Sequence, residues 1–308
     1  MDLQVLFNLA DPRIRKIWDE KNTQLSQRLE YQNLGYKDSD AEIRDPQFDN
    51  FTGLGLATLT GEKQPYSSEE KDQTSTVTIS PQKWTNSIDI TEEQLRFNLW
   101  REINDATGAL ANSEYGRIDT EAAKLFYLGF GTTFQSGPDA LALFSSAHTR
   151  VSTSGTQSNT TTNTLSYENL KTAAQAIDRF EDDKGIQLMP CRNLCLIVAR
   201  EKKERGIEVL RSIGNPDNAQ RVSNVFNTGE SNIQLVTANW IPRTTYNNYW
   251  FLVDKERASM MLHMVWGWRP RFDSDNTIKN GTKIYTASSM FKPGFQSFQF
   301  SYGANATS

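Results

Sequence analysis

The 308-residue sequence predicts an α+β fold, and three patterns carry that prediction. A capped helical region follows residue 91, an ordered α/β unit occupies about 165–265, and period-two apolar runs lie near both. Hydrophobic residues make up 37% of the chain and charged residues 23%. That composition indicates a globular protein with a sizeable core and excludes disordered, collagen-like and coiled-coil proteins.

Residues 1–50 are predicted to form a polar, weakly patterned N-terminal arm with little core of its own beyond one helix. One helix is expected over residues 12–29, where Ile14, Ile17, Trp18 and later leucines recur at helical spacing. The arm carries seven basic and ten acidic residues, which excludes a basic nucleic-acid-binding tail. It is either a loosely attached surface segment or an element that grips a neighbouring subunit.

Residues 51–90 are predicted to form a long, projecting β-hairpin with a charged, turn-rich tip at 61–75. The apolar residues of its two limbs are Leu54, Leu56, Leu59, Val77, Ile79, Ile88 and Ile90. A two-stranded ribbon alone is marginally stable in water. The sequence therefore suggests that this hairpin packs against another chain.

Residues 91–94 have the form of a capping box, with Thr91 and Gln94 placed to satisfy free amides at a helix start. Leu95, Leu99 and Ile103 are expected on one face of that helix. A second helix is predicted after Gly108, ending near Gly129, and Gly116 weakens the case for its continuity.

Residues 149–164 contain ten Ser or Thr residues out of sixteen. With almost no apolar side chain to pack, the segment is predicted to be an exposed loop or a connector between domains.

The α/β unit that follows has the clearest pattern in the chain. Ser166 is expected to cap a helix that stops by Gly185, and residues 194–199 form an apolar run typical of a strand buried on both faces. Another helix is predicted up to Gly214. Further strands are predicted at 233–238, 249–253 and 260–266.

The C-terminal tail adds strands that are expected to rejoin the first body of the protein. Asn280-Gly281 is a hairpin signal, and Phe298, Phe300 and Tyr302 alternate with period two.

No catalytic, cofactor-binding or metal site is predicted, and no cofactor is expected. Gly53-x-Gly55 and Gly129-x-Gly131 both lack the third glycine of a phosphate-binding loop. The side chains available for a metal are Cys191, Cys195, His148 and His263. Their spacing does not match a zinc site, and two cysteines in so long a chain form no disulfide framework.

A hydrolytic site would have to use Ser145 or Ser146 with His148, whose three-residue separation in a loop does not place a base against a nucleophile. The acidic pairs Glu69-Glu70 and Asp182-Asp183 are expected to be solvated rather than catalytic. The net charge of −4 argues against direct nucleic-acid binding. No secretion signal is predicted, and the apolar runs are too short to cross a membrane.

Several short stretches are similar to one protein family. They are residues 143–148 (LFSSAH), 165–170 (LSYENL), 185–190 (GIQLMP), 194–199 (LCLIVA), 232–240 (NIQLVTANW) and 250–254 (WFLVD). Together with the order of arm, long hairpin, long helix and inserted α/β domain, they resemble the HK97-fold major capsid proteins of tailed bacteriophages. The similarity is strongest to the Mu-type major head subunit branch.

The resemblance implies a non-enzymatic shell subunit that forms hexamers and pentamers of an icosahedral head around double-stranded DNA. It implies an N-terminal arm at 1–50, an extended loop at 51–90, a peripheral domain at 91–148 and 262–308, and an axial domain at 149–261. The implied partners are other copies of the chain, a portal, a separate scaffold protein and, in some heads, a decoration protein. DNA would be enclosed without sequence-specific binding, and no membrane is involved.

Localisation in the virion capsid, after assembly in the host cytoplasm, is also implied. Lys63 and Lys71 lie in the loop that carries a crosslinking lysine in some shells of this fold, but no partner Asn matches, so no crosslink is predicted. Two alternatives remain open. They are an encapsulin-like nanocompartment shell and a soluble α/β hydrolytic enzyme that uses residues 145–148.

Overall fold

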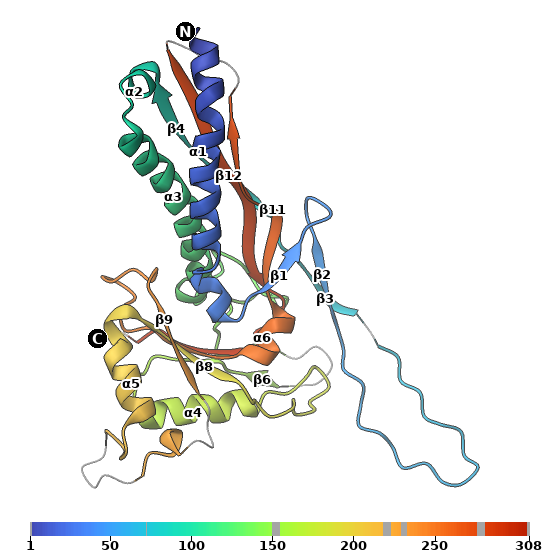
Figure 1. Ribbon diagram of the computed structural model, residues 1–308. Helices are drawn as coiled ribbons and strands as arrows, with labels where there is room; N and C mark the ends of the chain where they lie inside the picture. Colours follow the sequence, from blue (N-terminus) through green and yellow to red (C-terminus); the bar gives the residue numbers. More distant parts are fainter. Residues whose placement is uncertain are drawn as a thin grey trace.

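Two long antiparallel strands, β11 (Leu262–Ser274) and β12 (Thr282–Phe295), run along the elongated half of the molecule in the computed structural model (Figure 1). The structure describes residues 2–71, 73–149, 155–217, 223–228, 233–275 and 281–306. β1 (Lys37–Asp40) and β4 (Gln82–Thr91) complete a four-stranded sheet in the order β1-β11-β12-β4. The predicted hairpin between β11 and β12 is confirmed, although Asn280 lies outside the described residues.

Helices α1 (Leu3–Ser26) and α3 (Trp100–Tyr127) lie side by side along this sheet (Figure 1). Apolar side chains from both helices and the sheet share one core, which includes Trp18, Ile103 and Tyr285. The expectation that the arm's helix starts at residue 12 is wrong. The helix begins at residue 3 and contains Pro12, because Phe7, Ala10 and Ile14 anchor both sides of the proline in that core.

The capping box at Thr91 is confirmed, and it starts the short helix α2 (Glu92–Arg96). The chain then turns at Asn98, whose φ of 53° is left-handed, so α2 and α3 are separate helices rather than one. α3 itself runs without a break through Gly108 and Gly116. A Cβ on Gly116 would lie 3.1 Å from the Trp240 ring, so the glycine allows a close approach between α3 and that tryptophan.

β2 (Gln47–Phe51) and β3 (Gln73–Thr78) form a two-stranded ladder, and the chain between them projects far from the body (Figure 1). The predicted projection is confirmed with different limits. Leu54, Leu56 and Leu59 lie beyond the ladder and form no strand, since no neighbouring strand offers them backbone partners within the described residues. Ile88 and Ile90 belong to β4 in the other sheet.

The second half of the molecule is a five-stranded sheet in the order β7-β13-β10-β8-β9. Its strands are β7 (Thr160–Thr161), β8 (Leu194–Ala199), β9 (Gln234–Ala238), β10 (Trp250–Asp254) and β13 (Ser301–Ala304). α4 (Tyr167–Asp178) packs on β10 and β13, and α5 (Lys203–Arg211) packs on β8 and β9. The predicted buried strand at 194–199 is confirmed.

Several shorter elements complete the fold. Helix α6 (Lys255–Met261) separates β10 from β11. β5 (His148–Thr149) pairs with β6 (Thr156–Gln157), and three 3-10 turns lie at η1 (Glu30–Leu34), η2 (Arg200–Lys202) and η3 (Val225–Asn227). Ser166 caps α4 as predicted, but the helix ends at Asp178, and Gly185 serves the following turn.

Two expectations about this half are wrong. The last strand, β13, pairs with β10 in the five-stranded sheet instead of rejoining the first body, because Phe300 and Tyr302 belong to the core beneath that sheet. The Ser/Thr-rich segment 149–164 also contributes packed structure, since β7 pairs with β13 and Asn159 is fully buried. None of the helices in the described ranges has the length and apolarity required to span a bilayer.

Candidate functional site

The loop between β2 and β3 is the largest exposed feature of the chain, and its apolar side chains are turned to solvent. Leu59 is 103% exposed, Tyr66 92% and Leu56 76%, and Leu54 is also exposed. Monomeric proteins seldom place several large apolar side chains on one unsupported element. The loop therefore has the chemistry of a contact surface for another protein chain.

Hydrogen bonds between its two limbs hold the loop together. Thr58 and Ser67 share a hydrogen bond of 2.7 Å between their hydroxyls, and the Gly55 amide donates to the Glu69 carboxylate at 2.7 Å. Glu69 also pairs with Lys184 of the five-stranded unit at 2.7 Å. The Lys184 hydrogen bond, the Gly55 amide and the Lys184 charge lower the pKa of Glu69. These contacts set the direction of the loop.

The two loop lysines lie in different places. Lys63 is in the turn at the tip, with a left-handed φ of 66°, and is exposed. Lys71 lies at the base, with its ammonium 5.7 Å from the centre of the Phe51 ring. Neither position tests the prediction that no crosslink forms.

His148, the residue considered as the base of a hydrolytic site, has Asp139 and Asn159 as partners instead of a serine. The ring is 1% exposed, its Nδ1 lies 2.6 Å from Asp139 Oδ2, and its Nε2 lies 3.2 Å from Asn159 Oδ1. The ring also stacks on Phe298 at 3.7 Å. Both ring nitrogens therefore have partners other than a serine hydroxyl.

The serine side of that site is equally unsuited to catalysis. The Ser145 hydroxyl accepts a hydrogen bond from the Ala147 amide at 3.3 Å, and Ser146 is exposed. Burial alone would raise the pKa of the Asp139 carboxyl, but its hydrogen bond with His148 and the charge there outweigh burial and lower it. The geometry supports a buried hydrogen-bonded pair of His148 and Asp139 that fixes the 139–148 segment, and it gives no Ser–His contact.

The proposed metal ligands do not converge. Both cysteines are free, and His263 lies against Ser39 and stacks on Phe48 in another region. In the described part of the chain no three His, Cys, Asp or Glu side chains gather as a metal site would require. Burial raises the pKa of Cys195 to about 11 and raises that of Cys191 as well, which leaves both thiols protonated near neutral pH.

The acidic pairs are structural too. Asp182 Oδ1 accepts hydrogen bonds from the amides of Lys184 and Ile186 at 2.9 Å and 2.8 Å, and Glu69 pairs with Lys184.

Gly129, considered above for a phosphate-binding loop, lies just after the end of α3, where a Cβ would lie 2.5 Å from the Leu125 carbonyl oxygen. Its role is close packing.

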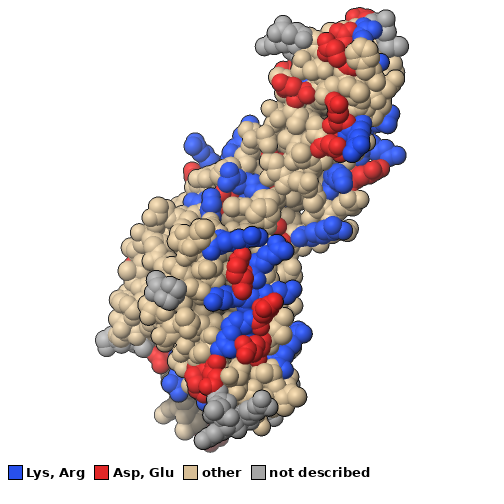
Figure 2. All heavy atoms as spheres, turned by 90° about the vertical axis from the view of Figure 1, so that its left-hand side faces the viewer, with Lys and Arg blue, Asp and Glu red and all other residues tan. Residues whose placement is uncertain are grey.

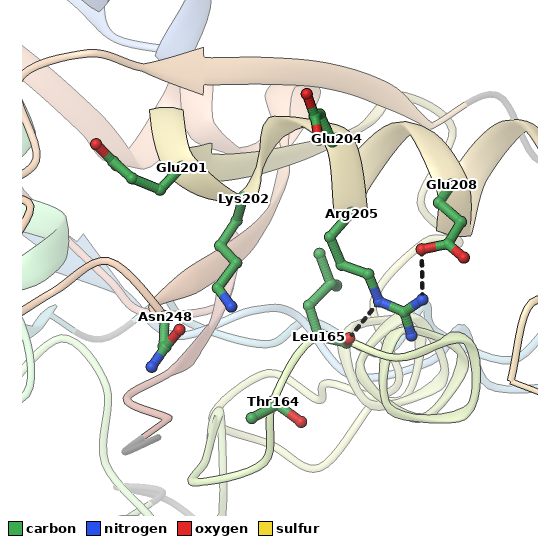
Figure 3. A pocket seen from close by; sticks show the side chains of 8 residues that line it. All are labelled: Thr164, Leu165, Glu201, Lys202, Glu204, Arg205, Glu208 and Asn248. Atoms are coloured by element: carbon green, nitrogen blue, oxygen red, sulfur yellow. Dashed lines mark hydrogen bonds and ion pairs between the residues drawn. The ribbon is translucent and has the colours of Figure 1, made fainter.

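A polar cavity of about 720 Å³ lies beside α5 and the segment before α4 (Figure 3). Its lining is Thr164, Leu165, Glu201, Lys202, Glu204, Arg205, Glu208 and Asn248. Arg205 donates to the Leu165 carbonyl oxygen and to Glu208, and Glu201 pairs with Arg243 outside the lining. Arg205, Glu208 and Glu201 are thus engaged by partners within the protein, and the lining gives no nucleophile with a bonded base.

Figure 2 shows the side of the molecule formed by α3 and α5, where Lys and Arg alternate with Asp and Glu. Arg117 pairs with Glu121 within α3, and Arg205 of α5 pairs with Asp217 beyond the end of that helix. On the described residues of this face there is no continuous basic field of the kind that follows a phosphate backbone.

Sequence reasoning missed three polar residues that hold the parts together. Lys283, 1% exposed, pairs with Asp11 of α1 at 2.6 Å. Asp119 of α3 accepts from the Tyr31 amide at 3.1 Å, and buried Asn159 donates to the carbonyl oxygens of Leu143 and Ser301. Each joins segments distant in sequence, so no local pattern marks it.

Two of the three comparisons with known proteins found similar proteins. A family model described as "Phage capsid protein" matches residues 74–298, well over half of the chain. No curated protein sequence matches. Among solved structures, the capsid of Ralstonia phage GP4 is 14% identical, with 89% of this chain and 87% of that chain covered and a TM-score of 0.53.

Two further solved structures are similar at low sequence identity. The capsid of Myoviridae Phage XM1 is 11% identical over 91% of this chain and 92% of that chain, with a TM-score of 0.53. A virus-like particle from Pyrococcus furiosus is 8% identical over 95% and 98%, with a TM-score of 0.52. Likeness at these identities concerns the fold.

Proposed function

Since this chain belongs to the phage capsid protein family and has an HK97-like capsid fold, we propose that it is the major capsid protein whose copies form hexamers and pentamers of an icosahedral head around double-stranded DNA. The observation that carries the proposal is the projecting loop between β2 and β3. Its exposed leucines and tyrosine need a protein surface to cover them. Repeated contacts of modest size, closed by symmetry, would hold such a shell together.

The parts of the subunit would divide this work. The loop, within 51–90, and the arm, at 1–50, would contact neighbouring subunits. The unit with the long helix, at 91–148 together with β11 and β12, would be the peripheral domain, and 149–261 the core of the axial domain around the symmetry axes. Pairing of β13 with β10 adds the last strand to the axial unit.

The proposal extends to partners and place. A portal, a separate scaffold protein and, in some heads, a decoration protein would join the shell, which would assemble in the host cytoplasm and become part of the virion. The interleaved charges of Figure 2 and the net charge of −4 support a wall that encloses DNA without sequence-specific binding. Membership of the Mu-type branch stays a prediction.

Electron microscopy of negatively stained protein, combined with size-exclusion chromatography at low and high concentration, tests the proposal. We expect rings, sheets or closed shells. A monomer at every concentration, with or without a co-expressed scaffold protein, would contradict it.

The encapsulin-like nanocompartment is the second candidate, and the similar fold of the virus-like particle from Pyrococcus furiosus is the observation that favours it. The contents of purified particles separate the two functions, because a nanocompartment would hold protein cargo and no DNA. The hydrolytic alternative is less well supported, since both nitrogens of His148 are already bonded.

A further inference from the structure

A small pocket of about 190 Å³ lies where β4, β12 and the second half of α3 meet the segment that follows that helix. Phe134, Phe291 and Pro293 give it apolar walls, and Trp84 of β4 and Lys292 of β12 also line it. It shares no lining residue with the polar cavity beside α5, and none of its described lining residues comes from the projecting loop.

Two hydrogen-bond donors of this lining lack partners. The Nε1–H of Trp84 is buried, and no acceptor among the described residues takes its hydrogen bond. The half-buried ammonium of Lys292 forms no hydrogen bond or ion pair with a described residue, and burial lowers its pKa. Because a buried donor without an acceptor destabilises the folded state, both groups gain from an acceptor that enters the pocket.

The charges around the pocket favour a negative occupant. Glu121 is the acidic side chain of the described lining, and its Oε1 lies 3.0 Å from Arg117 and 2.7 Å from Lys124. These two cations leave one positive charge in excess, and Lys292 adds another. An anion in the pocket would therefore meet a net positive field.

The indole donor is also held in place. The guanidinium carbon of Arg117 lies 4.3 Å from the centre of the Trp84 ring, and the Phe291 ring centroid lies 6.3 Å away. Since Arg117 is itself fixed by Glu121, the orientation of the indole does not depend on a ligand. A donor that is ordered in advance lowers the entropic cost of binding.

We propose that this pocket binds a carboxylate group, one oxygen of which accepts from Trp84 Nε1 and the other from the Lys292 ammonium. Two donors, one of them charged, match the two oxygens and single charge of a carboxylate, whereas a phosphate needs more donors for its oxygens. The apolar walls suit the aliphatic group that carries the carboxylate. An acidic side chain of another chain in the shell and a free small carboxylate share this chemistry.

Indole NMR signals of the unassembled, ¹⁵N-labelled subunit test the site. Trp84→Phe identifies the Trp84 signal by its loss, and sodium acetate is titrated against sodium chloride at equal ionic strength. We expect the Trp84 indole proton to shift downfield and to saturate with acetate, and to shift much less with chloride or inorganic phosphate. Lys292→Met keeps the aliphatic stem and should weaken acetate binding by at least about tenfold.

The chain offers two matched controls. Trp268 Nε1 is also buried without a partner but lies outside the pocket, so its signal should not follow acetate. Lys83→Met removes an exposed lysine beside Trp84 in sequence that does not line the pocket, and it should leave the affinity for acetate unchanged.

Equal shifts of the Trp84 and Trp268 signals, or a Trp84 shift that never saturates, would overturn the inference without any change at Lys292. Unchanged affinity in Lys292→Met would overturn it too, and the remaining indole signals report whether that variant is folded.

Solid-state NMR of sedimented particles without added carboxylate identifies the source of the group. A Trp84 signal already at its acetate-bound position indicates an acidic side chain of another chain, and a signal that moves only with acetate indicates a free carboxylate. A subunit that never assembles would contradict the proposed function and would leave the titration of the unassembled subunit as it stands.

Discussion

The carboxyl of Asp119 lies where three parts of the chain meet. It accepts from the Tyr31 amide of η1, while neighbouring Glu30 binds Asn239 in the connection after β9. Trp240, the next residue, packs on Gly116 one turn earlier in α3. This joint ties the N-terminal segment, the long helix and the five-stranded unit together, and it places a carboxyl where water has little access.

Burial raises the pKa of Asp119 to about 6, partly offset by hydrogen bonds from the Glu30 and Tyr31 amides. The unfolded chain releases this proton near pH 4, so the folded state holds more protons between about pH 4 and 6 and loses stability as pH rises. We expect Asp119→Asn to be more stable than the parent at pH 7, by up to about 3 kcal/mol, and to lose that advantage at pH 4.

Urea unfolding of the unassembled subunit at both pH values measures the difference. Asp105→Asn, an exposed change on the same helix, serves as control and should leave the free energy of unfolding nearly unchanged at either pH. An advantage of Asp119→Asn that is equal at pH 4 and pH 7 would contradict the argument.

Asn159 is the second residue on which packing depends. Its side chain accepts from the Ser145 amide, lies within hydrogen-bonding distance of His148 and donates to the carbonyl oxygens of Leu143 and Ser301. Asn159→Ala would leave these buried groups without partners. We expect a loss of about 2–4 kcal/mol in the free energy of unfolding.

Thermal unfolding compared with Thr162→Ala, an exposed change three residues away, checks this expectation. Equal melting temperatures for the two variants would show that Asn159 is not needed. No local pattern marks the role of Asn159, because ten Ser or Thr residues in sixteen predict exposure and the bond to Ser301 crosses 142 positions.

Among the elements, helix α1 departs most from what the sequence predicted. Trp18 stacks on Phe272 with ring centroids 5.1 Å apart, and Phe7 and Ile14 are fully buried. Asp11 adds a bond to buried Lys283. The helix is thus part of the subunit's core, and a role in contacting neighbours would fall to its outer face.

Trp18→Ala should therefore destabilise the isolated subunit by about 3–5 kcal/mol, the usual cost of emptying an aromatic site in a core. Leu9→Ala, on the same helix but at a side chain that is 66% exposed, should change the free energy of unfolding by less than about 0.5 kcal/mol. Denaturant unfolding of both variants decides between a core helix and a loosely attached arm. If the helix were a loosely attached arm, both substitutions would change the free energy of unfolding only slightly.

Elements with a local cause were predictable. The capping box at Thr91, the Ser166 cap and the apolar run at 194–199 all formed as expected, since each depends on neighbours in sequence. The place of β13 depends on pairing with β10 about fifty residues earlier, which no period within 298–302 encodes. The bonding of His148 to Asp139 and Asn159 was not anticipated, because these residues lie 9 and 11 positions away and share no motif with it.

At the scale of the whole molecule, the subunit consists of a folded body and the projecting loop between β2 and β3, for which we propose contacts with other chains. The body has a continuous apolar core that includes side chains from α3, the 143–144 segment and the five-stranded sheet. The loop between β2 and β3 contributes almost nothing to that core, since Leu54, Leu56 and Leu59 are all exposed. Stability of the subunit and assembly of the shell should therefore be separable.

Deletion of residues 54–70 tests that separation. Phe51 pairs with Gln73, so the deletion leaves a four-residue connection, a length that hairpins commonly use. The ion pair between Glu69 and Lys184 that is lost is partly exposed to solvent, so its loss should have little effect on the stability of the body. We expect a subunit that melts within a few degrees of the parent and gives the same circular dichroism, but stays monomeric where the parent forms rings or shells. Particles of normal size from the deleted chain would place the assembly contacts elsewhere, and a large fall in melting temperature would mean that the loop supports the body after all.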